Sequence, residues 1–97
     1  MKGYWLILGT EISNDSAQSE YVSLWKPLAE KYQAQINPLR VPPLLREARD
    51  AHRLTIVEFP SYELAQACYD DPAYGEARRF ALQASERELL ILKGELA

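Results

Sequence analysis

The sequence has little cysteine, little histidine and no long hydrophobic run. Cys68 is the one cysteine and His52 the one histidine among 97 residues. An intramolecular disulfide is therefore excluded, and without HxxH, HxH or CxxC spacing the sequence predicts no metal site. No apolar run approaches the ~18 residues of a membrane span, so we expect no membrane partner. The lone cysteine favours a reducing, cytoplasmic setting.

The usual signatures of phosphate binding and of acyl transfer are also missing. No GxGxxG, GxxxxGK[ST] or GxSxG motif occurs, so the glycines that cradle a phosphate or present a nucleophilic serine are absent. Eleven basic and fourteen acidic residues give a formal net charge of −3. That balance offers no broad positive surface to a phosphate backbone. We expect neither a nucleic-acid partner nor a cofactor.

What the sequence does contain is the composition of a small globular domain. Hydrophobic residues make up 47% and charged residues 26% of the chain, which is typical of a folded protein. The length suits one hydrophobic core and not two. Residues 1–97 are therefore expected to form a single domain.

Three segments are apolar on both strand parities and predict strands with two buried faces. They cover residues 4–10, 54–59 and 88–93. A weaker candidate covers residues 35–41, where Pro38 favours a sheet edge. The polar residues 44–53 predict an exposed connection or a short helical turn.

Helical signals separate these strands. Apolar side chains recur at steps of three and four over residues 16–33, although Pro27 predicts a kink or a break there. Ser61 is a suitable N-cap for a helix through residue 70, and Asp71-Pro72 has the sequence of a second helix start. The order β-α-β-β-α-β predicts an α+β, ferredoxin-like fold, a four-stranded antiparallel sheet with helices on one face.

This fold leaves the second face of the sheet without helices. The strands carry large apolar residues on both parities, so that face would expose more than the ~300–600 Å² usual for a monomer's largest patch. No other segment of the chain is expected to be long enough to cover it. A second copy packed face to face is the most economical cover, and a larger partner or a higher oligomer are the alternatives. We expect a homodimer through the open sheet face.

Several short motifs resemble the DUF1330 family over most of the chain. They are Val-Glu-Phe-Pro-Ser-Tyr at 57–62, Tyr-Asp-Asp-Pro-Ala-Tyr at 69–74, Lys-Gly-Tyr-Trp at 2–5 and Glu-Lys-Tyr at 30–32. The resemblance implies a dimeric α+β barrel and no established reaction. Family members carry Gly-Gly where this chain has Gln33-Ala34, and glycine permits positive-φ turns that these residues resist.

Glu58 is the candidate catalytic residue. Its parity places it with Leu54 and Ile56 on an otherwise apolar face, where desolvation would raise the pKa of a carboxyl group towards that of a general base. The alternative is a structural role, either a cap to backbone N–H groups or an ion pair with an arginine. The arginines considered are Arg53, Arg78 and Arg79.

Other side chains are candidates for contacting a ligand. Tyrosine suits both cores and pockets, arginine can bind a carboxylate bidentately, and His52 is either a solvated loop residue or a pocket residue. The candidates are Tyr4, His52, Arg53, Tyr62, Tyr74 and Arg78. Ser61 is interpreted as an N-cap rather than a nucleophile, and Cys68 as a small buried hydrophobic residue.

Together these features predict a homodimeric domain that binds a small, mostly apolar molecule between sheet and helices. Cofactor-independent acid–base or oxygen chemistry, as in monooxygenases or isomerases of similar fold, is an analogy of fold alone. The competing hypothesis is a dimerisation or binding module without chemistry. A cavity of roughly 300 Å³ beside Glu58 would favour the first and a filled core the second.

Overall fold

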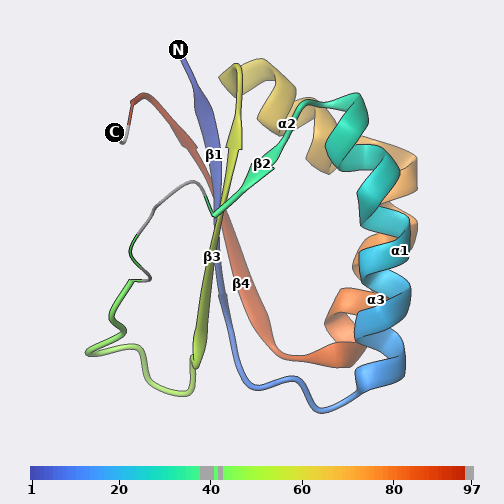
Figure 1. Ribbon diagram of the computed structural model, residues 1–97, viewed down its shortest axis with the longest axis vertical. Helices are drawn as coiled ribbons and strands as arrows, with labels where there is room; N and C mark the ends of the chain where they lie inside the picture. The colour runs from blue at the N-terminus through green and yellow to red at the C-terminus, as the bar shows by residue number, and fades with distance from the viewer. Residues whose placement is uncertain (38–40, 42, 96–97) are drawn as a thin grey trace.

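The computed structural model describes residues 1–37, 41 and 43–95. Figure 1 shows the elements of these ranges with the helices on one side of the sheet. In chain order they are β1 (Gly3–Gly9), α1 (Asp15–Lys31), β2 (Gln35–Ile36), β3 (Arg53–Phe59), α2 (Tyr62–Asp70), α3 (Pro72–Ala84) and β4 (Arg87–Lys93).

The four strands form one antiparallel sheet in the order β2-β3-β1-β4. The central strand β1 pairs with β3 so that Trp5 lies opposite Val57, and with β4 so that Trp5 lies opposite Ile91. This confirms the predicted ferredoxin-like α+β fold, and the three long strands begin and end within one residue of the predicted segments.

Each helix begins at the kind of cap that its sequence offers. The side chains of Asn14, Ser61 and Asp71 accept hydrogen bonds from backbone N–H groups in the first turns of α1, α2 and α3. Pro72 occupies the first position of α3, where its missing N–H does no harm. Ser61 is thus an N-cap, as expected.

Helix α1 is not broken at Pro27. It runs without interruption from Asp15 to Lys31, so of the two outcomes expected at Pro27, a kink or a break, the break does not occur. Pro27 and Ser23, whose carbonyl the proline ring crowds, both lie on the exposed side of the helix, where water can hydrate that carbonyl. The opposite side buries Tyr21, Trp25 and Leu28, and this packing stabilises a single helix.

The turn after α1 adopts the conformation that glycine usually provides. Gln33 has a φ of 56°, and the bonds from Gln33 N–H to the Glu30 carbonyl and from Ala34 N–H to the Ala29 carbonyl complete a Schellman motif. Gln33 therefore adopts the positive φ that a non-glycine residue resists. The two hydrogen bonds satisfy helix-end carbonyls and offset the strain of Gln33.

Strand β2 is shorter than the predicted strand over 35–41. It contains Gln35 and Ile36, both exposed. Asn37 then takes a φ of 50°, and its side-chain oxygen accepts a hydrogen bond from Ile56 N–H. Asparagine tolerates this left-handed conformation, which follows the end of β2. Pro38 and Pro42 lie outside the described residues.

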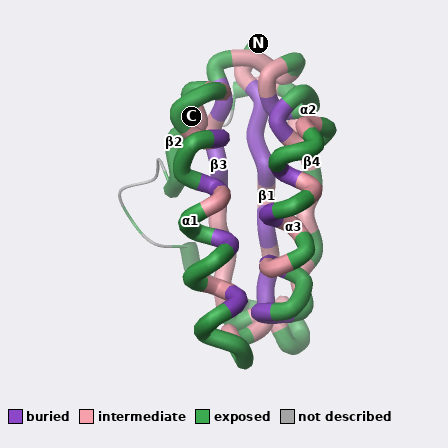
Figure 2. The backbone as a smooth tube through the Cα atoms, turned by 90° about the vertical axis from the view of Figure 1, so that its right-hand side faces the viewer, coloured by how far each residue is buried: buried purple, intermediate pink, exposed green. Residues whose placement is uncertain are grey.

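The core lies between the helices and one side of the sheet, which we call the helix-facing side. Trp5 is fully buried there, donates from Nε1 to the Ala65 carbonyl at 2.9 Å and contacts the rings of Trp25, Phe59 and Tyr74. Figure 2 shows the buried β1 behind the helices, whose buried residues turn inward. Small residues of α3 such as Ala77 and Ala81 let this helix pack closely.

The other side of the sheet, the open face, carries no helix (Figure 1). Its leucines are half-buried or exposed, with Leu90 at 44% exposure. The register places on it Tyr4, Leu6, Leu8, Leu54, Ile56, Glu58, Glu88, Leu90 and Leu92. Residues 43–52 also lie on this side (Figure 1), although no other segment was expected to be long enough to cover it. None of the described helices is long and apolar enough to span a membrane.

Candidate functional site

Glu58 lies on the open face near the end of β3, with its carboxylate 3.0 Å from the ammonium group of Lys2. The hydrogen bond to Glu58 raises the pKa of Lys2. Tyr4 lies beside Glu58 in the sheet register and is buried. The partner of Glu58 is therefore Lys2, and not one of the arginines considered from the sequence.

Tyr62 and His52 lie apart from each other. Tyr62 opens α2 beside Gly3, and the ammonium group of Lys93 lies 5.4 Å from the centre of its ring. The largely exposed His52 has Nδ1 3.9 Å from a carboxylate oxygen of Glu11. The structure does not bring these two candidates together with Glu58.

Tyr74 belongs to the core on the helix-facing side. It is fully buried, and burial raises the pKa of its hydroxyl group, which stays protonated at neutral pH. Its oxygen accepts a hydrogen bond from Arg87 at 2.9 Å and lies 3.3 Å from the hydroxyl of Tyr21. The guanidinium of Arg87 also lies 5.2 Å from the centre of the Tyr21 ring.

The arginine candidates have neutral partners. Arg78 donates to the hydroxyl of Tyr69 at 3.1 Å. Arg53 donates from Nε to the Thr10 carbonyl at 3.1 Å and from Nη2 to the hydroxyl of Ser85 at 3.2 Å. Arg53 reaches the helix-facing side of the sheet, away from Glu58.

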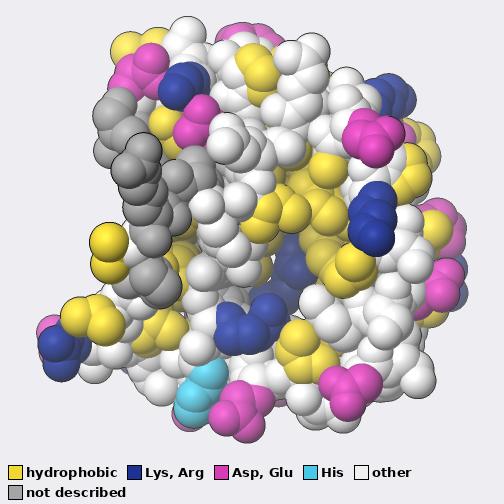
Figure 3. All heavy atoms as spheres, viewed as in Figure 1, with side chains coloured by type: hydrophobic (Ala, Val, Ile, Leu, Met, Phe, Trp, Pro, Cys, Tyr) yellow, Lys and Arg dark blue, Asp and Glu magenta, His cyan; other side chains and the backbone are white. Residues whose placement is uncertain are grey.

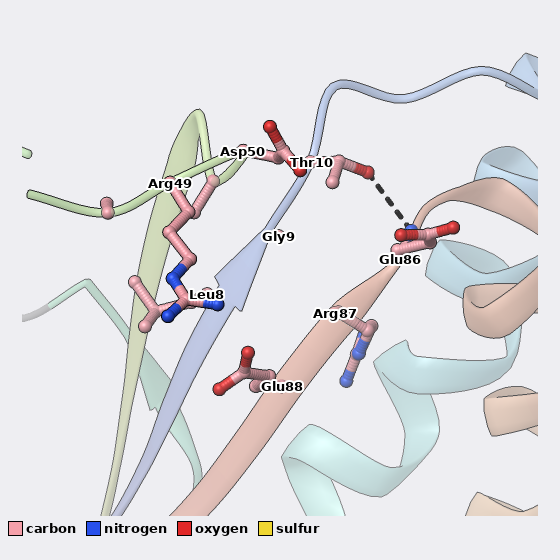
Figure 4. A pocket seen from close by; sticks show the side chains of 10 residues that line it. Leu8, Gly9, Thr10, Arg49, Asp50, Glu86, Arg87 and Glu88 are labelled. Carbon is pink, nitrogen blue, oxygen red and sulfur yellow. Dashed lines mark hydrogen bonds between the residues drawn. The ribbon is translucent and has the colours of Figure 1, made fainter.

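A groove of about 370 Å³ lies at one end of the sheet, between residues 48–51 and the ends of β1 and β4. Figure 4 shows Arg49 reaching over Leu8 in this groove, and Arg87 and Glu88 turning to opposite sides of β4. Arg49, Asp50 and Glu86 are exposed. Exposed charges of both signs are well hydrated, so this groove offers a ligand little binding energy.

A second cavity of about 270 Å³ lies between α3 and β4. It brings together two of the predicted ligand contacts, Tyr74 and Arg78. Its lining is Tyr69, Tyr74, Arg78, Leu82, Arg87 and Leu89.

The third cavity, which we call the cleft, lies between α1 and the helix-facing side of the sheet and measures about 180 Å³. Its walls are mainly aromatic and aliphatic, with two arginines. They are Trp5, Ile7, Gln18, Tyr21, Val22, Trp25, Ile36, Arg53, Thr55, Val57 and Arg87. Figure 3 shows the molecule hollowed between sheet and helices, with hydrophobic and basic atoms around the hollow. Glu58 lines none of these three cavities.

Sequence reasoning missed the residue that borders all three cavities, Arg87. The predicted strand began at residue 88, one position too late, so Arg87 was not assigned to a face. Arg87 has the same strand parity as Leu89 and Ile91, and this parity could have placed it on the helix-facing side of the sheet. Tyr21 and Trp25 belong to the apolar repeat predicted over residues 16–33, but that repeat did not identify them as cleft residues.

The cleft contains no set of metal ligands. Among residues 1–37, 41 and 43–95, no group of three His, Cys, Asp or Glu side chains could hold a metal ion. Cys68 is buried as expected, and burial raises the pKa of its thiol to about 12, so it is protonated at neutral pH. The chemistry available in the cleft is apolar contact, hydrogen bonding and positive charge.

Comparisons with known proteins identify a family and a fold. The family model described as "Domain of unknown function (DUF1330)" matches residues 2–95. A protein of unknown function from Rhodopseudomonas palustris shares 19% identity, with a TM-score of 0.62 over 99% of this chain and 84% of that one. A dimeric ferredoxin-like protein of unknown function from Jannaschia sp. CCS1 shares 12% identity, with a TM-score of 0.65 over 97% and 100%.

A dimeric protein of unknown function and ferredoxin-like fold from Bacteroides fragilis is also similar. It shares 11% identity, with a TM-score of 0.58 over 96% of each chain. No curated protein sequence matches this chain. At these identities the solved structures establish the fold and nothing more.

Proposed function

Because this chain belongs to the DUF1330 family, a family of unknown function, we propose a function from its own geometry. The protein is a homodimeric domain that binds a small, mostly apolar molecule in the cleft between α1 and the sheet. The observation that carries this proposal is the cleft itself, with aromatic walls and two arginines in a space of about 180 Å³.

The size and walls of the cleft define the body of the ligand. A cavity of about 150 Å³ is large enough to hold a benzene ring. Trp5, Tyr21 and Trp25 provide aromatic surface, while Ile7 and Val57 provide aliphatic surface. Such walls favour a ligand with one ring or an equivalent aliphatic body.

The dimeric part of the proposal concerns the open face. Its apolar residues, such as Leu6 and Leu90, lack the helical cover of the other side. The similar proteins from Jannaschia and Bacteroides are described as dimeric, which supports a second copy as the cover. The cleft and this interface lie on opposite sides of the sheet, so ligand binding and dimerisation can be tested separately.

The proposal assigns Glu58 to its ion pair with Lys2 and not to the ligand. The pair lies on the open face, so Glu58→Gln should leave ligand affinity unchanged. Tyr21 lines the cleft and Glu58 does not, so we expect Glu58 to take no part in any reaction of the bound molecule.

The cleft can be blocked from its exposed side. Val22 lines the cleft from α1 and is 39% exposed, so Val22→Trp should fill the space without disturbing the core. The neighbouring exposed Ser23 does not line the cleft, and Ser23→Trp is the matched control.

Thermal-shift screening of wild-type protein against single-ring metabolites should give hits that Ser23→Trp retains and Val22→Trp loses. Isothermal titration then measures the affinity of each hit. Hits that survive in Val22→Trp with unchanged affinity would place the ligand elsewhere and overturn the proposal.

A further inference from the structure

Two arginines lie in the same row of the sheet, on either side of a glycine. Gly9 of β1 is paired with Arg53 of β3 and with Arg87 of β4. Both arginines line the cleft on the helix-facing side. Their Cα atoms are two strand spacings apart, about 10 Å, so two long side chains can converge on a group bound between them.

Gly9 leaves the space that this arrangement uses. A Cβ atom at position 9 would lie 2.7 Å from Nη2 of Arg53. The guanidinium of Arg53 therefore extends over the glycine, toward the side of the strand where Arg87 lies. Any larger residue at position 9 would push Arg53 aside.

Both guanidinium groups are fixed by neutral partners. Arg53 is bonded to the Thr10 carbonyl and the Ser85 hydroxyl. Arg87 is bonded to the Tyr74 hydroxyl and lies over the ring of Tyr21. A guanidinium carries five N–H donors, so among the described residues these contacts hold the side chains and leave further donors of each group unused.

The charges around the two arginines bear on the ligand that they can bind. In the described part of the chain, no acidic side chain lies within ion-pair distance of Arg53 or Arg87, although both are half-buried. The neighbouring Glu88 turns to the other side of β4 (Figure 4). Guanidinium groups stay charged at neutral pH, and partly buried charges without a counter-charge are costly.

We infer that the cleft selects a single-ring carboxylic acid, with its carboxylate on Arg53 and Arg87 and its ring against Tyr21 and Trp25. This inference rests on the proposed function and adds the ligand's charge. Arginine pairs with planar carboxylates through two parallel hydrogen bonds. The apolar walls require an organic body beyond the anion, which inorganic phosphate lacks.

Isothermal titration with three probes tests the inference. Benzoate should bind wild-type protein, and its uncharged isostere benzamide should bind at least about tenfold more weakly, because charge-assisted hydrogen bonds are lost. Inorganic phosphate should bind more weakly than benzoate. Equal affinity for benzoate and benzamide, tighter binding of phosphate, or no benzoate binding at millimolar concentration would overturn it.

Variants identify the residues. Arg53→Gln and Arg87→Gln should each weaken benzoate binding about tenfold and benzamide binding less, because only benzoate presents a charge to the guanidinium groups. Arg79→Gln is the control, because Arg79 is exposed and pairs with Glu76. Circular dichroism checks the fold of each variant, and Gly9→Ala displaces Arg53 independently. If Arg53→Gln, Arg87→Gln and Gly9→Ala all leave the benzoate affinity unchanged, the inference is contradicted.

The two proposals fail in different ways. If Val22→Trp abolishes binding of benzoate and benzamide alike while the two bind equally tightly, the cleft binds ligands but does not select acids. If benzoate binds Val22→Trp as tightly as wild type, the cleft is not the site and the proposed function itself is wrong.

Discussion

Asp71 shows how residues of a recognisable motif stabilise the fold rather than form a site. Its carboxylate accepts hydrogen bonds from the Tyr32 hydroxyl at 2.6 Å, from Lys31 at 2.9 Å and from Ala73 N–H at 2.9 Å. The Lys-Tyr pair that ends α1 therefore binds the cap of α3. These motif residues join two helices, which explains their presence without any role in chemistry.

The hydrogen bond from Tyr32, with those from Ala73 and Lys31, lowers the pKa of Asp71 to about 2, below the ~3.9 of an unfolded aspartate. The stabilisation is therefore complete above about pH 4 and is lost as pH falls towards 2. Asp71→Asn keeps a capping side chain but loses the charge. We expect it to lower the free energy of unfolding at pH 7, with a smaller difference from wild type at pH 3.

Urea denaturation at the two pH values measures this difference. Asp70→Asn is the control, because Asp70 is exposed and lies next to Asp71. A deficit of Asp71→Asn that is equally large at pH 3 and pH 7 would contradict the charge-based explanation.

At the scale of elements, the end of α1 holds a non-glycine residue in a positive-φ conformation that such residues disfavour, because its surroundings stabilise it there. Two hydrogen bonds of the Schellman motif, together with the packing of Trp25 and Leu28, hold Gln33 at a φ of 56°. This conformation costs a non-glycine residue about 1 kcal/mol of conformational free energy. The packing of α1 against α3 offsets this free-energy cost.

Gln33→Gly should therefore raise the free energy of unfolding by about 1 kcal/mol, because glycine adopts the left-handed conformation without strain. Gln83→Gly, in the last turn of α3, should lower it by a similar amount, because there glycine only loosens a regular helix. Chemical denaturation compares the two substitutions. A loss of stability in Gln33→Gly would show that the turn is not strained.

At the scale of the whole molecule, the sheet divides two tasks between its sides. The helix-facing side holds the core and the cleft, with Arg53 and Arg87 at one end. The open face carries leucines and the Lys2–Glu58 ion pair. Residues 43–52 lie on that side as well (Figure 1). A partner on the open face would thus leave the cleft unobstructed.

Leu90→Arg should convert the proposed homodimer to a monomer, because it places a charge on the open face, halfway along the edge strand β4, where Leu90 lies beside Leu6. Sedimentation velocity at micromolar concentration measures the mass. The control is Leu82→Arg on α3, which is 59% exposed on the helical side and should remain dimeric. A monomeric wild-type protein, or a Leu90→Arg variant that is still dimeric, would rule out this interface.

Much of the architecture could be predicted because its signals are local. Two-sided apolar strands, the caps at Ser61 and Asp71 and the apolar repeat of α1 each act over a few residues, and the structure contains all of them. The site was less predictable. Tyr74, Arg53 and Arg78 reach cavities, but Glu58 lines none of those described, and Arg87 was overlooked.

The sequence by itself determined which segments become strands and helices, and that the sheet has an apolar second face. Only the tertiary structure decided that Gly9 lies between Arg53 and Arg87, that Glu58 meets Lys2, and that α1 passes through Pro27 unbroken. The physical reason is the separation along the chain of the residues that interact. Parity and capping depend on neighbours along the chain, whereas strand register and helix packing join residues that are far apart in the sequence and meet only when the sheet and the core form together.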